Sequence, residues 1–328
     1  MYNEFLFLLE YTDIGLAIGL VLLLICFTIL LFRKWKVMCT ILKYKDCVGR
    51  NFDYEISYKE ELIIIPRETY GNEYAMIGIC TGAVQDPLLY DGMNEFGLVC
   101  GGLAFTNNAN YINIEDVDYG DYVYTPYDFV FQILSSFKTV KEVKKHLNKS
   151  HIINKQYSDE FPNSDLHWFI ADEKESIIVE QTTDGLNIYD GEVMTNNPPY
   201  DLMIDAVEHN LKNIGYEYGE IVEGRYYTRG YQTEYLDGSY TSMGRFERVT
   251  YLKDKLEKNS KSNDINETFH LLSSVEQIYG ATPVQDKFEY TIYSVVYDMG
   301  NKKIWIKTYD KLCPTNYLIT NELERIQL

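Results

Sequence analysis

The pattern of apolar and polar positions separates a short leader from a long folded region. From Ile14 to Phe32 the residues are uncharged and mostly aliphatic, and basic residues follow at once. Beyond residue 38 the apolar runs are short and are separated by glycine and acidic turn residues, which is typical of strands. These runs predict strands at Thr40–Tyr44, Leu62–Pro66, Tyr74–Cys80 and Gly97–Phe105.

The period of the pattern lengthens after residue 124. Thr125 followed by Pro126 is a helix start signal that the sequence YDFVFQILSSF continues, and Thr139 opens a second helix through VKEVKKHL. The later elements also come in groups. Strands are predicted at His167–Ile170, Ser176–Glu180 and Leu186–Tyr189, helices near Asp201–Leu211, Arg245–Lys258 and Ile265–Ser274, and a closing hairpin at Tyr290–Asp298 and Lys303–Tyr309.

Grouped strands and grouped helices predict an α+β fold of stacked layers, with two sheets between helices, rather than an alternating parallel α/β fold. One stretch, Gly215 to Met243, is rich in Tyr, Gly and Thr and has no clear period. It is too long for a plain connection, so it is predicted to be a functional loop or an assembly arm.

The leader, residues 1–38, has three interpretations: a transmembrane segment, a propeptide, or an upstream extension. A helix over residues 14–32 would be about 28 Å long, roughly the thickness of a bilayer core. Because the basic cluster follows the apolar run, a secretory signal is disfavoured and a retained anchor would leave the bulk of the chain in the cytoplasm. A translation start at Met38 gives the same location, and this start is favoured. Residues 39–328 would then form the working domain.

Composition excludes several classes of function. The chain has 328 residues, 46% of them hydrophobic, and a formal charge of −19, which argues against nucleic acid and anionic membrane surfaces as partners. Six cysteines include no C-x-x-C pair, so neither a zinc knuckle nor a thioredoxin-type site is supported. Free thiols in a reducing compartment fit this pattern better than disulfides. Thirty tyrosines suit half-exposed strands, or the wall of a binding pocket.

Cys39, directly after Met38, is the candidate with the clearest chemistry. It is either an ordinary core cysteine in the first strand or the first residue of a mature chain. In the second case its α-amine, with a pKa near 8, could serve as the general base for its own thiol. Arg50 and Asp53 follow 11 and 14 residues later, a spacing that lets a hairpin return them beside Cys39. None of the five histidines lies in a local cysteine-protease signature.

A series of motifs runs in order from residue 38 to about residue 310. They are MCT, GRNFDYE, IIIPR, YDGMNEFGLVCGGLAF, LHWFIAD with SIIVEQT, MTNNPPYD, GRFERVTYL and KTYD. Together they resemble the choloylglycine hydrolase family, the N-terminal-nucleophile amidases that include bile salt hydrolases and penicillin V acylases. The resemblance implies a four-layer αββα sandwich, no cofactor or metal, and a homo-oligomer, commonly a tetramer.

The resemblance also implies roles for single residues. Cys39 would be the nucleophile and its freed amine the base, with Asp53 binding the amine and Arg50 near the sulfur. Asn196 would give a side-chain N–H to the oxyanion and Arg245 would complete the charged cluster. Ala104 stands where the family usually has Asn or Tyr, and its backbone N–H would be the second oxyanion donor. The segment EYLDGSYTSMGRF lacks the prolines that the family often shows before its arginine.

Three functions follow as expectations. The first is hydrolysis of a small N-acyl amide by the Cys39 thiolate, with conjugated bile salts as the expected substrates. The second is a related amidase that acts on penicillin V or another N-acyl amine. The third is a membrane-anchored protein, held through residues 14–32, that binds ligands without catalysis because an uncleaved Cys39 has an amide in place of an amine.

Overall fold

The computed structural model describes residues 38–211, 216–217, 221–222, 225–226, 232–233 and 236–328. The predicted anchor and the rest of the leader, up to residue 37, lie outside these residues. Within the described part, no helix is long and apolar enough to cross a membrane.

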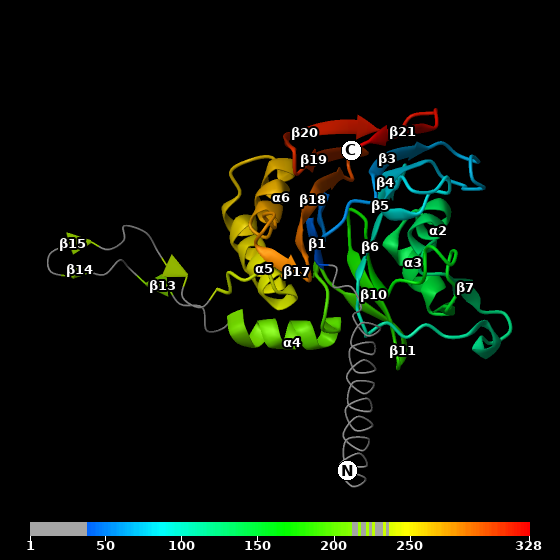
Figure 1. Ribbon diagram of the computed structural model, residues 1–328, viewed down its shortest axis with the longest axis horizontal. Helices are drawn as coiled ribbons and strands as arrows, with labels where there is room; N and C mark the ends of the chain where they lie inside the picture. The colour runs from blue at the N-terminus through cyan, green and yellow to red at the C-terminus, as the bar shows by residue number, and fades with distance from the viewer. Residues whose placement is uncertain (1–37, 212–215, 218–220, 223–224, 227–231, 234–235) are drawn as a thin grey trace, which may run out of the picture. The chain divides into compact units, whose positions relative to one another are not determined.

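Two large antiparallel sheets lie face to face (Figure 1). The first has the strand order β12-β1-β2-β18-β19-β20, and β17 pairs with β18. Its strands are β1 (Met38–Tyr44), β2 (Cys47–Tyr54), β12 (Val193–Met194), β17 (Thr282–Val284), β18 (Lys287–Asp298), β19 (Lys303–Thr308) and β20 (Lys311–Leu318).

The second sheet has the order β11-β10-β9-β6-β5-β4-β3-β21. Its strands are β3 (Glu60–Ile65), β4 (Met76–Thr81), β5 (Leu89–Asn94), β6 (Val99–Ala104), β9 (Leu166–Ala171), β10 (Ser176–Thr182), β11 (Gly185–Asp190) and β21 (Glu324–Gln327).

Helices cover the outer faces of both sheets, so that the four layers run α, β, β, α (Figure 1). Helices α2 (Phe129–Ser136) and α3 (Val140–Leu147) lie on the second sheet, and α5 (Ser242–Asn259) and α6 (Asp264–Ser273) lie on the first, with α4 (Tyr200–Leu211) beside α5. The predicted αββα sandwich is therefore confirmed. The remaining pieces are η1 (Ile114–Asp116), the parallel pair β7 (Tyr122–Tyr124) and β8 (Ser150–Ile152), and four two-residue strands, β13 (Tyr216–Glu217), β14 (Ile221–Val222), β15 (Arg225–Tyr226) and β16 (Gln232–Thr233).

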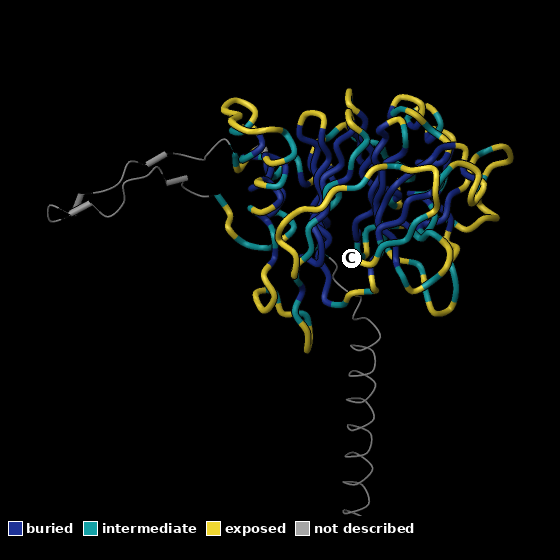
Figure 2. Tube along the Cα trace, turned by 90° about the horizontal axis from the view of Figure 1, so that it is seen from above, coloured by how far each residue is buried: buried dark blue, intermediate teal, exposed yellow. Residues whose placement is uncertain are grey.

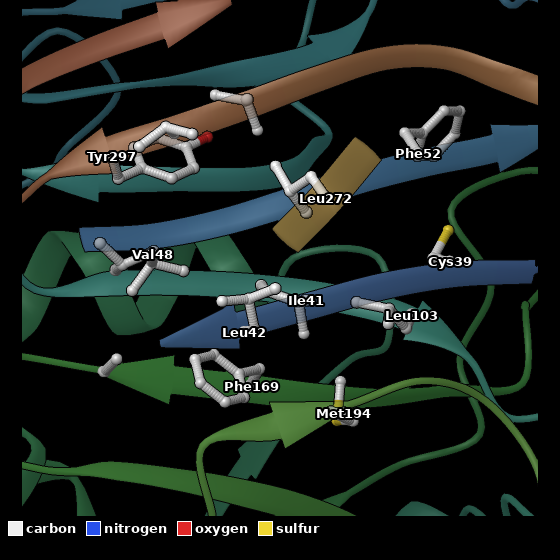
Figure 3. Packing of buried hydrophobic residues seen from close by; sticks show 14 of the residues in the cluster. Cys39, Ile41, Leu42, Val48, Phe52, Leu103, Phe169, Met194, Leu272 and Tyr297 are labelled. Carbon is white, nitrogen blue, oxygen red and sulfur yellow. The ribbon is translucent and has the colours of Figure 1, made fainter. Parts of the chain in front are cut away.

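Strand alternation produces two hydrophobic cores, because successive side chains point to opposite faces of a sheet. In β9, Phe169 packs between the sheets with Ile41, whereas Trp168 and Ile170 pack under α2 and α3. Figure 3 shows Cys39 in the core between the sheets, close to Phe52 and Leu103. The strands at the centre of the two sheets are accordingly buried and many connecting segments are exposed, as is most of β20 (Figure 2).

Each strand and helix that the apolar pattern predicted is present, with shifted ends. Helix α2 begins at Phe129, later than the signal at Thr125 and Pro126, because both the amide and the hydroxyl of Thr125 donate to Asp128 and hold a turn there. Thr139 caps α3 as predicted, accepting from the Glu142 amide. Strand β5 was not predicted, and 13 of the 29 residues from Gly215 to Met243 lie outside the described residues.

We expect Gly49→Ala to lower the free energy of unfolding by about 1–3 kcal/mol. The new Cβ would lie 2.5 Å from Thr268 Cγ2 and 3.1 Å from Leu272 Cδ1, where α6 crosses β2. Urea denaturation followed by circular dichroism measures the change. Gly238→Ala is the control, since its Cβ would meet nothing within 4 Å. Equal effects at the two positions would contradict the tight α6 packing.

Candidate active site

The β1–β2 hairpin brings the first candidate residues together. Its register places Cys39 opposite Phe52 and Met38 opposite Asp53, through a tight turn in which Lys45 adopts a φ of 50°. Arg50 and Cys39 have side chains on the face toward the second sheet, and Arg50 Nη2 lies 3.9 Å from Cys39 Sγ. The hairpin return that the spacing predicted is therefore present.

A buried ion pair holds Arg50 in place. Its Nη1 donates to Asp91 Oδ2 and to the Tyr90 carbonyl (2.7 Å), and its Nη2 donates to the Gly102 carbonyl (2.8 Å). The same aspartate accepts hydrogen bonds from the hydroxyls of Tyr293 and Tyr297. All of these side chains are buried. The guanidinium therefore has a fixed counter-ion on the side away from the sulfur.

Asn196 lies at the backbone nitrogen of Cys39. Its Oδ1 accepts from Cys39 N–H (2.9 Å) and from Arg245 Nη2 (2.7 Å), and its Nδ2 donates to the Ala104 carbonyl (2.9 Å). Two donors converge on Oδ1, so the orientation of the amide is determined and its NH₂ group faces Ala104. Among the described residues the Ala104 carbonyl is the one acceptor of Nδ2, so its second hydrogen has no partner there.

The backbone of Ala104 turns toward the same place. Phe105 N–H donates to the Asp165 carbonyl (2.8 Å), so Ala104, one residue earlier, has its N–H and C=O on the opposite edge of β6. The bond from Asn196 to the Ala104 carbonyl agrees with this alternation. The N–H and C=O of Ala104 therefore lie on the side of Asn196, although Ala104 lacks the Asn or Tyr side chain that the family usually has.

Arg245 joins these elements from the first turn of α5. Its Nη1 donates to the Cys39 carbonyl and to Thr40 Oγ1 (2.7 Å), and its Nε donates to the Tyr240 carbonyl (3.0 Å). Thr241 caps the helix by accepting from the Gly244 amide, which fixes where this turn begins. Burial lowers the pKa of the Arg245 guanidinium, while Asp53 acts in the opposite direction.

Asp53 faces the helices rather than the second sheet. Its Oδ1 accepts from Thr291 Oγ1 (2.6 Å) and its Oδ2 from Gln277 Nε2 (3.1 Å). Burial raises the pKa of its carboxyl to about 6, and Arg245 opposes that shift. The nitrogen of Cys39, here a peptide nitrogen with one hydrogen, donates to Asn196 and not to Asp53.

The Cys39 thiol is neutral at physiological pH while Met38 is attached. Burial raises its pKa to about 11, although Arg50 acts in the opposite direction. The expected cation, Arg50, is thus at the sulfur, but burial raises the pKa of the thiol more than Arg50 lowers it. A thiolate at this position needs a base that removes the proton during attack.

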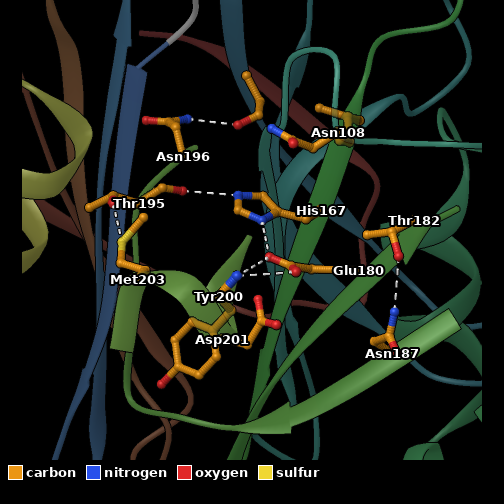
Figure 4. Close-up of polar contacts among 12 residues, drawn as sticks. Asn108, His167, Glu180, Thr182, Asn187, Thr195, Asn196, Tyr200, Asp201 and Met203 are labelled. Atoms are coloured by element: carbon orange, nitrogen blue, oxygen red, sulfur yellow. Dashed lines mark hydrogen bonds and ion pairs between the residues drawn. The ribbon is translucent and has the colours of Figure 1, made fainter. Parts of the chain in front are cut away.

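A second polar chain supports the turn that carries Asn196 (Figure 4). His167 Nε2 donates to the Thr195 carbonyl (2.9 Å) and His167 Nδ1 lies 3.0 Å from Glu180 Oε1. Glu180 also accepts from the Tyr200 amide at the start of α4 (3.2 Å). Because Thr195 precedes Asn196, these bonds hold its backbone in register with β1.

Sequence reasoning missed four residues of the site. Asp91 lies within the motif YDGMNEFGL, which suggested a relationship but no role for the aspartate. Gln277 and Thr291, which bind Asp53, carry no motif. Glu289 Oε1 accepts from the Met38 backbone N–H (2.8 Å), and no signal in the sequence indicated that contact.

The arrangement suits nucleophilic attack on a carbonyl. A thiol lies beside a guanidinium, and Asn196, whose Nδ2 donates to the Ala104 carbonyl, lies at the nitrogen of the same cysteine. No group of three or more His, Cys, Asp or Glu side chains in the described part of the chain could hold a metal ion.

The family of linear amide C–N hydrolases known as the choloylglycine hydrolase family matches residues 37–323. The chain belongs to this family. It is accordingly a hydrolase of linear amide C–N bonds that acts on small amides. It is 38% identical over 297 residues to a bile salt hydrolase/transferase of Lactiplantibacillus plantarum, covering 83% of this chain and 90% of that protein.

Other relatives agree on the family and on the fold. A bile salt hydrolase/transferase of Clostridium perfringens is 33% identical over 300 residues, covering 83% of this chain and 90% of that protein. The crystal structure of a variant conjugated bile acid hydrolase from Clostridium perfringens superposes with a TM-score of 0.79 at 29% identity, covering 89% of this chain and 97% of that chain. Penicillin V acylase from Agrobacterium tumefaciens shares the fold, with a TM-score of 0.67 at 20% identity over 88% and 91% of the two chains.

We expect Asp91→Ala to lower the free energy of unfolding by about 3–5 kcal/mol, because Arg50 would remain buried without its counter-ion. Tyr297→Phe removes one hydrogen bond to a charged group and should cost about 1.5–3 kcal/mol. Chemical denaturation measures both. Lys258→Ala, which breaks the exposed pair with Asp254, should change stability by no more than about 0.5 kcal/mol. A loss at Asp91 as small as at Lys258 would contradict the importance of the buried pair.

Proposed function

We propose that Cys39 is the catalytic nucleophile, that the working enzyme begins at this residue, and that it hydrolyses conjugated bile salts. The observation that carries the proposal is the pair of contacts on Cys39: Arg50 at its sulfur and Asn196 at its nitrogen. Both contacts lie on residues that the family motifs singled out.

The proposed reaction has two halves. The Cys39 amine accepts the thiol proton as the sulfur attacks the amide carbonyl, and a C–S bond forms. Asn196 Nδ2 and the Ala104 N–H donate to the oxyanion, and the bond between Asn196 and the Ala104 carbonyl supports a common role for the two residues. The ammonium then gives its proton to the leaving nitrogen as the C–N bond breaks. Water hydrolyses the thioester, with the amine again as base.

The charged residues have separate proposed roles. Arg50 stabilises the thiolate, and Arg245 orients Asn196 and the Cys39 carbonyl through the bonds described above. Asp53 would accept from the free ammonium, which has three hydrogens where the peptide nitrogen has one. The register that pairs Asp53 with Met38, the residue before Cys39, supports this role.

Bile salt conjugates are favoured as substrates by the relatives named bile salt hydrolase, at 38% and 33% identity over most of the chain. Penicillin V is the second candidate, but its support is a likeness of fold alone. Turnover of glycine and taurine conjugates beside penicillin V and acyl-homoserine lactones tests the choice. Faster turnover of penicillin V than of every bile salt conjugate would refute it.

The domain boundary and the location are part of the same proposal. Residues 39–328 would form the mature enzyme in the cytoplasm, produced by a start at Met38 and removal of that methionine. A homo-oligomer, a tetramer by resemblance to the family, is the expected assembly, which light scattering measures.

We expect the intact mass of the protein purified from its natural reading frame to correspond to a chain that begins at Cys39. A small residue after an initiator methionine favours its removal. A mass that includes residues 1–38 would instead support the anchored, ligand-binding alternative, because an acylated Cys39 nitrogen is no base.

Cys39→Ala is expected to abolish amide hydrolysis, a loss of at least about a thousandfold in kcat, since the variant has no nucleophile. Cys313→Ala is the matched control: its thiol is also free, but it is exposed on β20, and its activity should equal that of the parent. Residual turnover by Cys39→Ala at more than a hundredth of the parent rate would rule out the assignment.

A further inference from the structure

Glu289 occupies an unusual position on β18. Its side chain is fully buried, and its Oε1 accepts from the backbone N–H of Met38 at 2.8 Å. Its Oε2 is also buried and has no hydrogen-bond partner among the residues that the structure describes. An unsatisfied buried carboxyl oxygen costs free energy, so such a group calls for a functional explanation.

The acceptor lies one residue from the nitrogen of Cys39. A residue of extended chain spans about 3.3–3.6 Å, so Glu289 Oε1 is no more than about 6.4 Å from Cys39 N. Two hydrogen bonds through one water cover roughly 5.6 Å, so one water in the space of Met38 could bridge the two groups. Removal of Met38 takes away the present donor to Glu289 and creates an ammonium no more than about 6.4 Å from Glu289 Oε1.

The surrounding charges raise the pKa of the Glu289 carboxyl group, so that a nearby ammonium can change its protonation. Burial raises the pKa of Glu289 to about 9, the neighbouring Asp53 and Glu55 add to the shift, and Arg245 and the Met38 N–H oppose it. Glu55 is itself a buried carboxyl without a hydrogen-bond partner among the described residues. With Met38 attached, Glu289 therefore carries a proton at neutral pH. A new positive charge beside it favours the carboxylate.

We propose that Glu289 is a positioning residue for the α-amine of processed Cys39, as a carboxylate that holds the ammonium directly or through one water. When Met38 is lost, the Glu289 O–H bond breaks and its proton joins the amine, which gives a carboxylate and an ammonium. The ammonium releases a proton to solvent before the reaction begins. In each catalytic half the neutral amine then takes the proton from the attacking thiol or water, and the carboxylate stabilises the ammonium that forms. This inference rests on the proposed function of Cys39.

The test follows the acid limb of the pH profile. A nearby carboxylate stabilises the ammonium and raises the pKa of the amine, so Glu289→Gln should lower that pKa. We expect the acid limb of kcat/KM for a glycine-conjugated bile salt to move down by about one pH unit. The rate of Cys39 alkylation by iodoacetamide should shift in the same direction, and this readout needs no substrate. Glu289→Asp keeps the charge and should leave both limbs within about 0.3 pH unit of the parent.

Glu267→Gln is the matched control, because Glu267 is another buried carboxyl but lies on α6 and binds Tyr44 and Ser260. In Glu267→Gln the acid limbs of kcat/KM and of the alkylation rate should not move, even if the variant is less stable. A Glu289→Gln enzyme with reduced rates but unshifted limbs would overturn the inference, since a purely structural role lowers amplitude alone. If that variant does not fold, a shift in Glu289→Asp as large as one unit overturns it as well.

Intact mass measured on every sample separates the two proposals. A parent protein that retains Met38, or that lacks turnover when Cys39 is first, refutes the proposed function. An active parent that begins at Cys39, together with unshifted limbs in Glu289→Gln, refutes only the role of Glu289.

Discussion

The buried pair of Arg50 and Asp91 connects the two sheets and locates the candidate site between them. Arg50 comes from β2 of the first sheet and Asp91 from β5 of the second, and neither has access to solvent. Two charges in such a place need further hydrogen bonds to offset the loss of water. Two tyrosine hydroxyls from β18 donate to Asp91, the Tyr90 carbonyl accepts from Arg50 Nη1 and the Gly102 carbonyl accepts from Arg50 Nη2, whereas Arg50 Nε has no hydrogen-bond partner among the described residues. These contacts hold Arg50 Nη2, the nitrogen that lies 3.9 Å from Cys39 Sγ, in one position.

The two faces of the sheet that contains β1 carry different groups of the site. The sulfur of Cys39 points between the sheets, where it meets a cation and apolar rings such as Phe52. Asp53 and Glu289, in contrast, lie on the side of the helices, and Arg245 crosses to the Cys39 backbone from there. A free α-amine at Cys39 would stand at the edge between these environments. That position explains how one residue could serve as nucleophile and base, since burial keeps the thiol neutral and the carboxyls would stabilise the ammonium that forms when the amine takes the thiol proton.

The sequence predicted the layers and the hairpin well because both depend on local signals. Alternation and turn residues mark the strands, and the short spacing between Cys39 and Arg50 allows a single return of the chain. It did not predict β5, because Asp91 and Asn94 make that strand look polar although each is buried with its partners in place. The contact of Glu289 with Met38 joins residues 251 positions apart, and no periodic pattern contains information at that separation.

The alanine at position 104 does not disturb the orientation of the two donors in the proposed oxyanion site. In the proposed oxyanion site, one donor is a backbone N–H whose direction is set by the pairing of β6 with β9, and no side chain at Ala104 is required for it. The other donor belongs to Asn196, whose amide cannot rotate by 180° without facing its NH₂ toward two donors, Arg245 and Cys39. Both donors are thus oriented before a substrate arrives. The groups that would stabilise the oxyanion therefore do not depend on which side chain stands at position 104.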